Sequence, residues 1–191
     1  MRRACYSACM KPRFIFVHGN QTTDWRNPWT LWLKTKLDGM GFETAFQLMP
    51  DPQVAHKDIW LAYLQDELKV GAEDVIIGWS SGAVAAMRYA ETHKIFGSIL
   101  ISPCYTDLGD DLEKQSGYYD TPWDWKSIKG NQKKIALVWG DNDPYISQSE
   151  FAYIALHLGP EKLKLPGAGH FETRQDMPEL LRYIEKTYPA V

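Results

Sequence analysis

The sequence has few cysteines, and those it has do not suggest a framework of disulfide bonds. Its 191 residues include Cys5, Cys9 and Cys104. A small, odd number of cysteines is typical of a protein that works in a reducing compartment. Cys5 and Cys9 have no further cysteine or histidine nearby to complete a metal site, so we expect no bound metal.

Long apolar runs and concentrated positive charge are missing as well. No run approaches the roughly 20 apolar residues that a transmembrane helix needs. The stretch that holds Arg2, Arg3 and Lys11 lacks the apolar region of a secretory signal. The chain has 21 Lys and Arg against 24 Asp and Glu, and no basic stripe. We therefore expect no membrane contact, no nucleic-acid partner and, by default, a cytoplasmic location.

The chain does contain short apolar runs that alternate with helix-like segments. We expect strands at residues 13–17, 42–49, 74–79, 97–102, 134–139 and 162–165. We expect helices at residues 28–39, 56–70, 82–93, 123–129, 149–158 and 178–187. Because the strands are continuous apolar runs, the pattern predicts a mostly parallel six-stranded sheet with helices on both faces.

The same pattern predicts how the chain is divided. Residues 1–11 read as a loose N-terminal extension, and residues 12–191 as one α/β domain of ordinary size. The longest irregular stretch, residues 103–122, is too short for a separate lid domain.

A serine between two glycines follows the third apolar run. Gly78-Trp79-Ser80-Ser81-Gly82 matches G-x-S-x-G between an apolar strand and an alanine-rich helix, which is the setting of a nucleophile elbow in α/β-hydrolases. Glycines are needed there because the sharp turn brings neighbouring backbones close. The helix N-terminus offers backbone N–H groups to developing negative charge. The pattern predicts Ser80 as a nucleophile.

A base and an orienting acid follow later strands. His170 lies in a glycine-rich loop after the sixth strand and is the candidate base. Asp143 follows the fifth strand and is the preferred acid, with Asp141 as the alternative. The order Ser80, Asp143, His170 is that of α/β-hydrolases. His18 lies too early in the chain for this order, and we interpret it as a residue that shapes its loop.

Two backbone donors are expected to form an oxyanion hole. One is the N–H of Ser81, directly after the nucleophile, and the other is the N–H of Asn20, in the loop after the first strand. A rival motif starts at Gly167 and Gly169 and resembles a dinucleotide-binding loop, but Glu172 stands where its third glycine belongs. We therefore expect no nucleotide or other cofactor.

Further segments extend the pattern far beyond the elbow motif. They are MPDP at 49–52, IW at 59–60, IIG at 76–78, SSGA at 80–83, AAMRYAETH at 85–93, DLGD at 107–110, SGY at 116–118, PW at 122–123 and GHF at 169–171. Together they resemble the retinoblastoma-binding protein 9 family of small serine hydrolases, over nearly the whole chain after residue 11. The resemblance implies the same triad on Ser80, Asp143 and His170, and a lidless sheet with the strand order 2-1-3-4-5-6.

Two departures from that family limit what the resemblance implies. Trp79 stands before the nucleophile, where relatives often carry histidine. The vertebrate member has a Leu-x-Cys-x-Glu segment that binds retinoblastoma-type pocket proteins, whereas the matching stretch here is LKVGA at residues 68–72. Cysteine and glutamate are both missing, so we do not expect that partner.

The leading functional hypothesis is hydrolysis of a small ester or amide through an acyl-enzyme on Ser80. Two alternatives stay open: a non-catalytic binding protein that keeps the fold, and acyl transfer to an acceptor other than water. Aromatic residues near the site are expected to favour aromatic or apolar substrates. The expected substrate-binding residues are Trp25, Trp79, Trp123 and Phe171.

Overall fold

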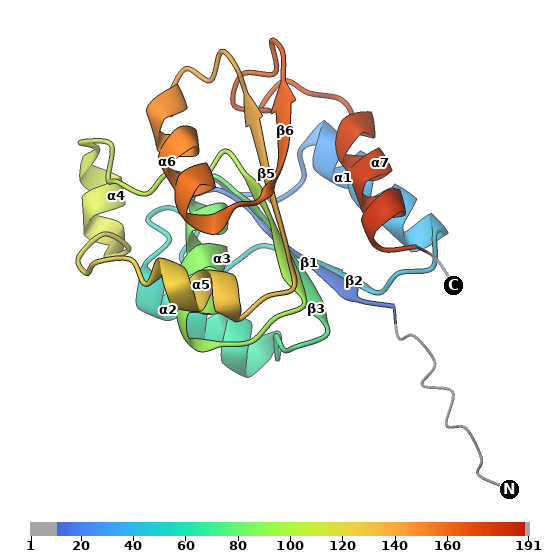
Figure 1. Ribbon diagram of the computed structural model, residues 1–191, viewed down its shortest axis with the longest axis horizontal. Coiled ribbons are helices and arrows are strands. Elements are labelled where there is room, and N and C mark those ends of the chain that lie inside the picture. The colour runs from blue at the N-terminus through green and yellow to red at the C-terminus, as the bar shows by residue number, and fades with distance from the viewer. Residues whose placement is uncertain (1–10, 190–191) are drawn as a thin grey trace, which may run out of the picture.

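Six parallel strands form the sheet of the computed structural model, which describes residues 11–189 (Figure 1). The order of the strands is β2-β1-β3-β4-β5-β6, so the expected fold class and strand order are confirmed. The strands are β1 (Arg13–Val17), β2 (Thr44–Phe46), β3 (Asp74–Trp79), β4 (Gly97–Ile101), β5 (Lys134–Gly140) and β6 (Glu161–Leu165).

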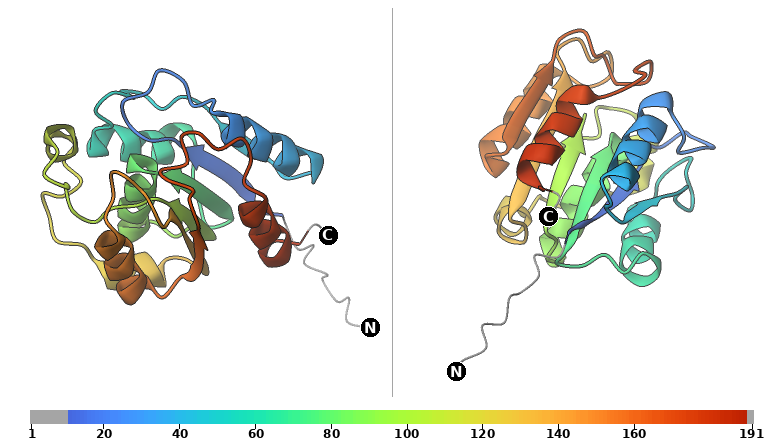
Figure 2. Two further views of the ribbon diagram at one scale, coloured as in Figure 1. Left: turned by 90° about the horizontal axis from the view of Figure 1, so that it is seen from above. Right: turned by 90° about the vertical axis from the view of Figure 1, so that its right-hand side faces the viewer.

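Helices cover both faces of the sheet. They are α1 (Pro28–Gly39), α2 (Lys57–Ala62) with the π-helical turn η1 (Tyr63–Glu67), α3 (Ser81–Thr92), α4 (Asp111–Ser116), α5 (Trp125–Gly130), α6 (Gln148–Leu158) and α7 (Pro178–Thr187). Figure 2 shows α1 and α7 together on one face, while α2, α3, α5 and α6 lie on the other. Among the helices of residues 11–189, none is long and apolar enough to cross a bilayer.

The inner strands β1, β3 and β4 are almost entirely apolar because both of their faces are buried under helices, whereas the edge strand β6 is largely exposed and carries Glu161, Lys162 and Lys164. In β1, Phe14 and Phe16 pack into the layer of α1 and α7, whereas Ile15 and Val17 pack into the layer of α3. All four side chains are fully buried. Burial on alternate faces explains why the sequence shows continuous apolar runs where a one-sided sheet would show alternation.

The structure differs from the expected elements in three places. The second strand spans only Thr44–Phe46, and the helix expected at 56–70 ends at residue 67 through η1. The stretch 103–122 contains α4, which begins where the Asp110 carboxylate accepts two backbone N–H groups and ends at Gly117 in the left-handed conformation. The expected extension lies outside the described residues, apart from Lys11, and the division into domains stays a prediction.

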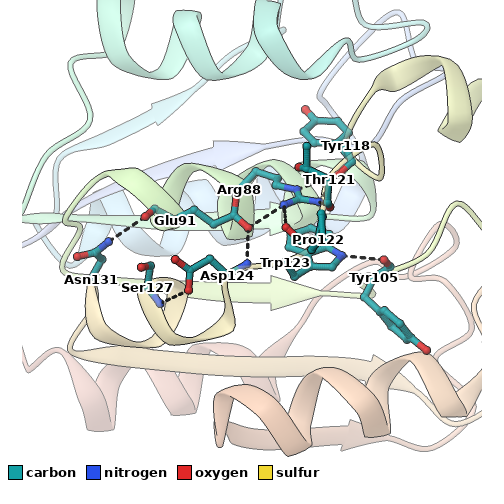
Figure 3. A network of polar contacts seen from close by, with 10 residues as sticks. All are labelled: Arg88, Glu91, Tyr105, Tyr118, Thr121, Pro122, Trp123, Asp124, Ser127 and Asn131. Carbon is teal, nitrogen blue, oxygen red and sulfur yellow. Dashed lines mark hydrogen bonds and ion pairs between the residues drawn. The ribbon is translucent and has the colours of Figure 1, made fainter.

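Arg88 in α3 holds the polypeptide that follows α4. Its guanidinium is buried, with the residue 3% exposed, and lies 3.6 Å from the ring centre of Trp123 (Figure 3). It donates to the backbone carbonyls of Tyr118, Thr121 and Pro122. Carbonyl oxygens with no strand or helix to bind them are thereby satisfied inside the protein.

Glu91 extends this network toward α5. Its carboxylate accepts from Arg88 at 2.7 Å and from the backbone N–H of Asp124 at 3.0 Å. The Asp124 side chain in turn accepts the N–H of Ser127 and caps α5. One arginine and one glutamate of α3 therefore fix the whole connection from α4 to α5 (Figure 3).

Replacement of Arg88 is expected to destabilise the fold strongly. Arg88→Leu leaves buried carbonyls and Glu91 without their donor, and loss of one partner of a buried charged pair costs about 3–5 kcal/mol. Arg88→Lys keeps the charge but not the planar set of donors, so it should fall between Leu and wild type. Urea unfolding measures the difference. Arg182→Leu, on the exposed side of α7, should change stability by less than about 0.5 kcal/mol, and an equal loss in both variants would contradict this account.

Candidate active site

Ser80 lies in the sharp turn between β3 and α3. Its backbone has φ 55° and ψ −123°, a combination that residues with side chains rarely adopt. A Cβ added at Gly78 would lie 2.4 Å from the carbonyl oxygen of Gly82, and one added at Gly82 would lie 2.0 Å from that of Val17. Both positions therefore require glycine, and this close packing keeps Ser80 in its strained conformation at the start of α3.

His170 and Asp143 form a buried pair across two loops. The distance from His170 Nδ1 to Asp143 Oδ2 is 2.8 Å, and their side chains are 7% and 0% exposed. Since an ionised carboxylate only accepts, Nδ1 carries the proton in this contact. The Nε2 atom of the imidazole is then left for another partner.

The surroundings of Asp143 keep its carboxylate charged. Oδ2 also accepts the hydroxyl of Ser102 at 2.8 Å, and Oδ1 accepts the backbone N–H groups of Tyr145 and Ile146. Burial by itself raises the pKa of Asp143, but the hydrogen bond and positive charge of His170 and the two N–H groups outweigh burial and leave the pKa below its usual value. The carboxylate is therefore a fixed acceptor at neutral pH.

The loops that carry the acid and the histidine are joined by close backbone packing and by two hydrogen bonds between side chains and backbone. A Cβ at Gly140 would lie 2.2 Å from the carbonyl oxygen of Gly169, so the two loops touch there. Asp141 Oδ1 accepts the N–H of Gly167, and Asn142 Oδ1 accepts the N–H of Gly169, each at 2.8 Å. Asp141, the alternative acid, thus binds the backbone of this loop rather than the imidazole.

Trp79 contacts both the backbone and the ring of the same histidine. Its indole Nε1–H donates to the backbone carbonyl of His170 at 3.0 Å, and the two rings are 5.9 Å apart. The rings of Trp29 and Trp79 are nearly perpendicular, with their centres 5.7 Å apart. The indole next to the nucleophile therefore holds the backbone of the histidine loop.

The loop after β1 runs directly beside Ser80. A Cβ at Gly19 would lie 3.2 Å from Ser80 Cβ. His18 Nε2 accepts the N–H of Met49 at 2.9 Å, so its proton is on Nδ1, which donates to the carbonyl of Gly19. Burial lowers the pKa of His18 and keeps it neutral. Its position matches the loop-shaping role expected from the sequence.

A cavity of about 800 Å³ opens at this edge of the sheet, within the usual range for ligand sites. Ser80, His170 and Asn20 lie on its wall, together with Trp25 and Trp79. Among residues 11–189, no three His, Cys, Asp or Glu side chains are placed to hold a metal ion.

Two expected substrate-binding residues do not lie on this wall. Phe171 is fully buried in the layer of α1 and α7. Trp123 donates to the carbonyl of Tyr105 and packs against Arg88. The structure therefore places both rings away from the cavity wall, and their assignment to substrate binding stays a prediction.

Three residues of the site were not expected from the sequence. Ser102 directly follows β4, so the rule that placed the other candidates at strand ends could have found it. The ring of Tyr145 meets the His170 ring edge-on at 5.1 Å. Glu113 of α4 lies on the cavity wall, and no motif pointed to it.

Comparison with known proteins places these observations in a family. The family model described as "Serine hydrolase" matches residues 14–182. Serine hydrolase RBBP9 of Rattus norvegicus is 39% identical over 173 residues, which cover 90% of this chain and 92% of the rat protein.

Solved structures share the fold at lower sequence identity. The ydeN gene product of B. subtilis has a TM-score of 0.82 at 22% identity and covers 93% of this chain and 98% of its own. A structure from a study of carboxylesterases of the Thaumarchaeon Nitrososphaera gargenis has a TM-score of 0.66 at 16% identity, with 92% and 90% covered. At these identities the likeness supports the fold alone.

Proposed function

The chain belongs to the serine hydrolase family and is a hydrolase, and on that premise we propose that it cleaves small ester or amide substrates through an acyl-enzyme on Ser80. One observation carries the proposal. His170, whose Nδ1 contacts buried Asp143 at 2.8 Å, lines the same cavity as the strained Ser80.

In the proposed reaction, Ser80 Oγ attacks the carbonyl carbon while His170 Nε2 takes its proton. The imidazolium then donates that proton to the leaving alcohol or amine, and the acyl group stays on Ser80. Water repeats the sequence with His170 as base and releases the acid. Asp143 keeps Nδ1 protonated, so that Nε2 is the basic nitrogen, and stabilises the imidazolium.

Backbone donors complete the proposed site. The N–H of Ser81 lies at the first turn of α3, and the N–H of Asn20 belongs to the loop that passes beside Ser80. Donors placed where negative charge develops are each worth about 3–4 kcal/mol of barrier. Within residues 11–189, Ser80 Oγ forms no hydrogen bond. Hydrogen bonds between a nucleophile and its base are often long without substrate and shorten when substrate binds.

The residues on the cavity wall favour uncharged aromatic or apolar substrates. Trp25, Trp79 and Leu108 offer apolar surface near Ser80, which favours aromatic or apolar groups by burial. Carboxylates of Asp24, Asp110, Glu113 and Glu172 also line the cavity, and within residues 11–189 its one Lys or Arg is Arg26, which is paired with Asp24. An anionic substrate would meet repulsion there.

Ser80→Ala is expected to abolish labelling by a fluorophosphonate probe and turnover of activated esters. The fold should persist, because the half-buried hydroxyl has no partner to lose. Ser149→Ala, on the exposed side of α6, is the control and should label as wild type does. Turnover by Ser80→Ala at the wild-type rate would contradict the proposed mechanism.

Asp143→Asn and Asp141→Asn form a matched pair. Asp143→Asn should lower kcat by several orders of magnitude, on the order of 10⁴ in the best-studied triad, because the wrong imidazole tautomer is held. Asp141→Asn retains an oxygen that can accept the Gly167 N–H and should change kcat by less than about threefold. The reverse ranking in steady-state kinetics would move the orienting role to Asp141.

Substrate choice is tested with two ester series. Values of kcat/KM should be higher for small aromatic or apolar acyl groups than for long-chain acyl groups, because an open site without a lid domain would leave much of a long chain in water. Within one acyl skeleton, a carboxylate substituent should lower kcat/KM relative to its methyl ester. Rates that climb steadily with chain length and ignore aromatic groups would refute this view of the cavity.

A further inference from the structure

Glu113 is a buried carboxylate on the cavity wall that takes no part in the reaction described above. It lies in α4, is 9% exposed, and receives three side-chain hydrogen bonds. Oε1 accepts Asn20 Nδ2 at 2.9 Å and Ser81 Oγ at 3.1 Å, and Oε2 accepts the hydroxyl of Tyr119 at 2.8 Å.

Asn20 and Ser81 are the two residues whose backbone N–H groups are assigned to the oxyanion. They come from different elements, because Asn20 follows β1 and Ser81 begins α3. A single oxygen of Glu113 binds both side chains and so fixes the distance between the two elements. Oxyanion donors lower the barrier only when they are held in place before the charge develops.

We propose that Glu113 is a positioning residue of the oxyanion hole, which joins the side chains of Asn20 and Ser81 so that their backbone N–H groups converge on one point. This inference rests on the proposed function and adds a residue from outside the triad. It assigns a catalytic consequence to α4, which otherwise forms only part of the cavity wall.

Neighbouring groups hold both the backbone and the carboxylate of Glu113 in place. The N–H of Glu113 donates to the Asp110 side chain that caps α4. The Tyr119 hydroxyl donates to Oε2 and stands 3.1 Å from Cys104 Sγ. Burial raises the pKa values of Cys104 and Tyr119, so both stay protonated at neutral pH, and the thiol is left to donate to the tyrosine oxygen.

The network of Arg88 fixes the other side of this wall. Its guanidinium binds the carbonyl of Tyr118, directly before Tyr119 (Figure 3). Glu150 holds the start of the same segment, because its carboxylate accepts the N–H groups of Tyr105 and Thr106. Glu113 is therefore presented by a segment that is anchored at both ends.

Geometry and charge give opposite expectations for Glu113. A negative carboxylate near a developing oxyanion opposes that charge, so its electrostatic effect on the transition state is unfavourable. Its hydrogen bonds to Asn20 and Ser81 are the favourable part. Glu113→Gln keeps an oxygen for both donors and removes the charge, whereas Glu113→Leu removes both.

The experiment compares these two variants with wild type. Glu113→Leu should lower kcat about 10- to 100-fold, less than the loss of a whole oxyanion donor, and should leave KM within about twofold. Glu113→Gln should keep kcat within about threefold of wild type or above it. Affinity for a boronic acid that forms a tetrahedral adduct on Ser80 should fall in step with kcat/KM. Asp111→Leu, which removes an exposed carboxylate from the same helix, should change none of these values.

The outcomes separate this inference from the proposed function. If Ser80→Ala abolishes labelling and turnover but a folded Glu113→Leu keeps wild-type kcat, only the role of Glu113 is overturned. Equal losses in Glu113→Gln and Glu113→Leu would also overturn it. If Glu113→Leu fails to fold, Ser81→Ala breaks one of the two joining contacts from the other end while retaining the backbone N–H, and it should show a smaller loss of kcat with unchanged KM, whereas wild-type kcat in this variant would overturn the role of Glu113. Activity that survives in Ser80→Ala would instead overturn the proposed function.

Discussion

The close approach of three backbones at Gly78 and Gly82 is the constraint on which the rest of the site depends. With no side chain at either position, α3 begins directly against the carbonyl of Val17 at the end of β1. That contact forces the positive φ of Ser80 and sets the first turn of α3 beside the loop of Gly19 and Asn20. Since strain of this kind costs on the order of 1–3 kcal/mol, it persists only where packing on both sides over-determines it.

The helix that starts at this contact organises the opposite side of the cavity as well. Its first turn presents Ser81 to Glu113, and its third turn presents Arg88 to the chain that follows α4. The loops of Asp143 and His170 instead meet where the backbone of Gly140 packs against Gly169, and Trp79 holds the backbone of His170. Two sets of contacts, one through α3 and one through the ends of β5 and β6, therefore meet at Ser80.

Features that follow from local pattern could be predicted from the sequence, and features that follow from distant contacts could not. Continuous apolar runs predicted the parallel sheet, the family resemblance implied its strand order, and the strand ends placed Ser80, Asp143 and His170 at one edge. The six residues of α4 are too few to show helical periodicity. The ends of this helix are set by the Asp110 cap and by Gly117. The contact of Glu113 with Asn20 spans 93 residues, and no spacing rule reaches that far. The sequence places aromatic residues such as Trp123 and Phe171 near the site but does not tell which way their rings face.

The placement of Glu113 has a consequence for how this protein can change over evolution. In the role proposed for Glu113, the shape of the cavity and the rate of the reaction depend on the same side chain, because Glu113 lines the cavity and contacts Asn20 and Ser81. Mutations in α4 that enlarge the cavity for a new substrate would loosen the same contacts. A wider substrate range would then be accompanied by a slower reaction. Trp25 and Leu108 also line the cavity but have no part in the proposed positioning of Asn20 and Ser81. Substitutions at these two positions could therefore change the specificity without slowing the reaction in this way.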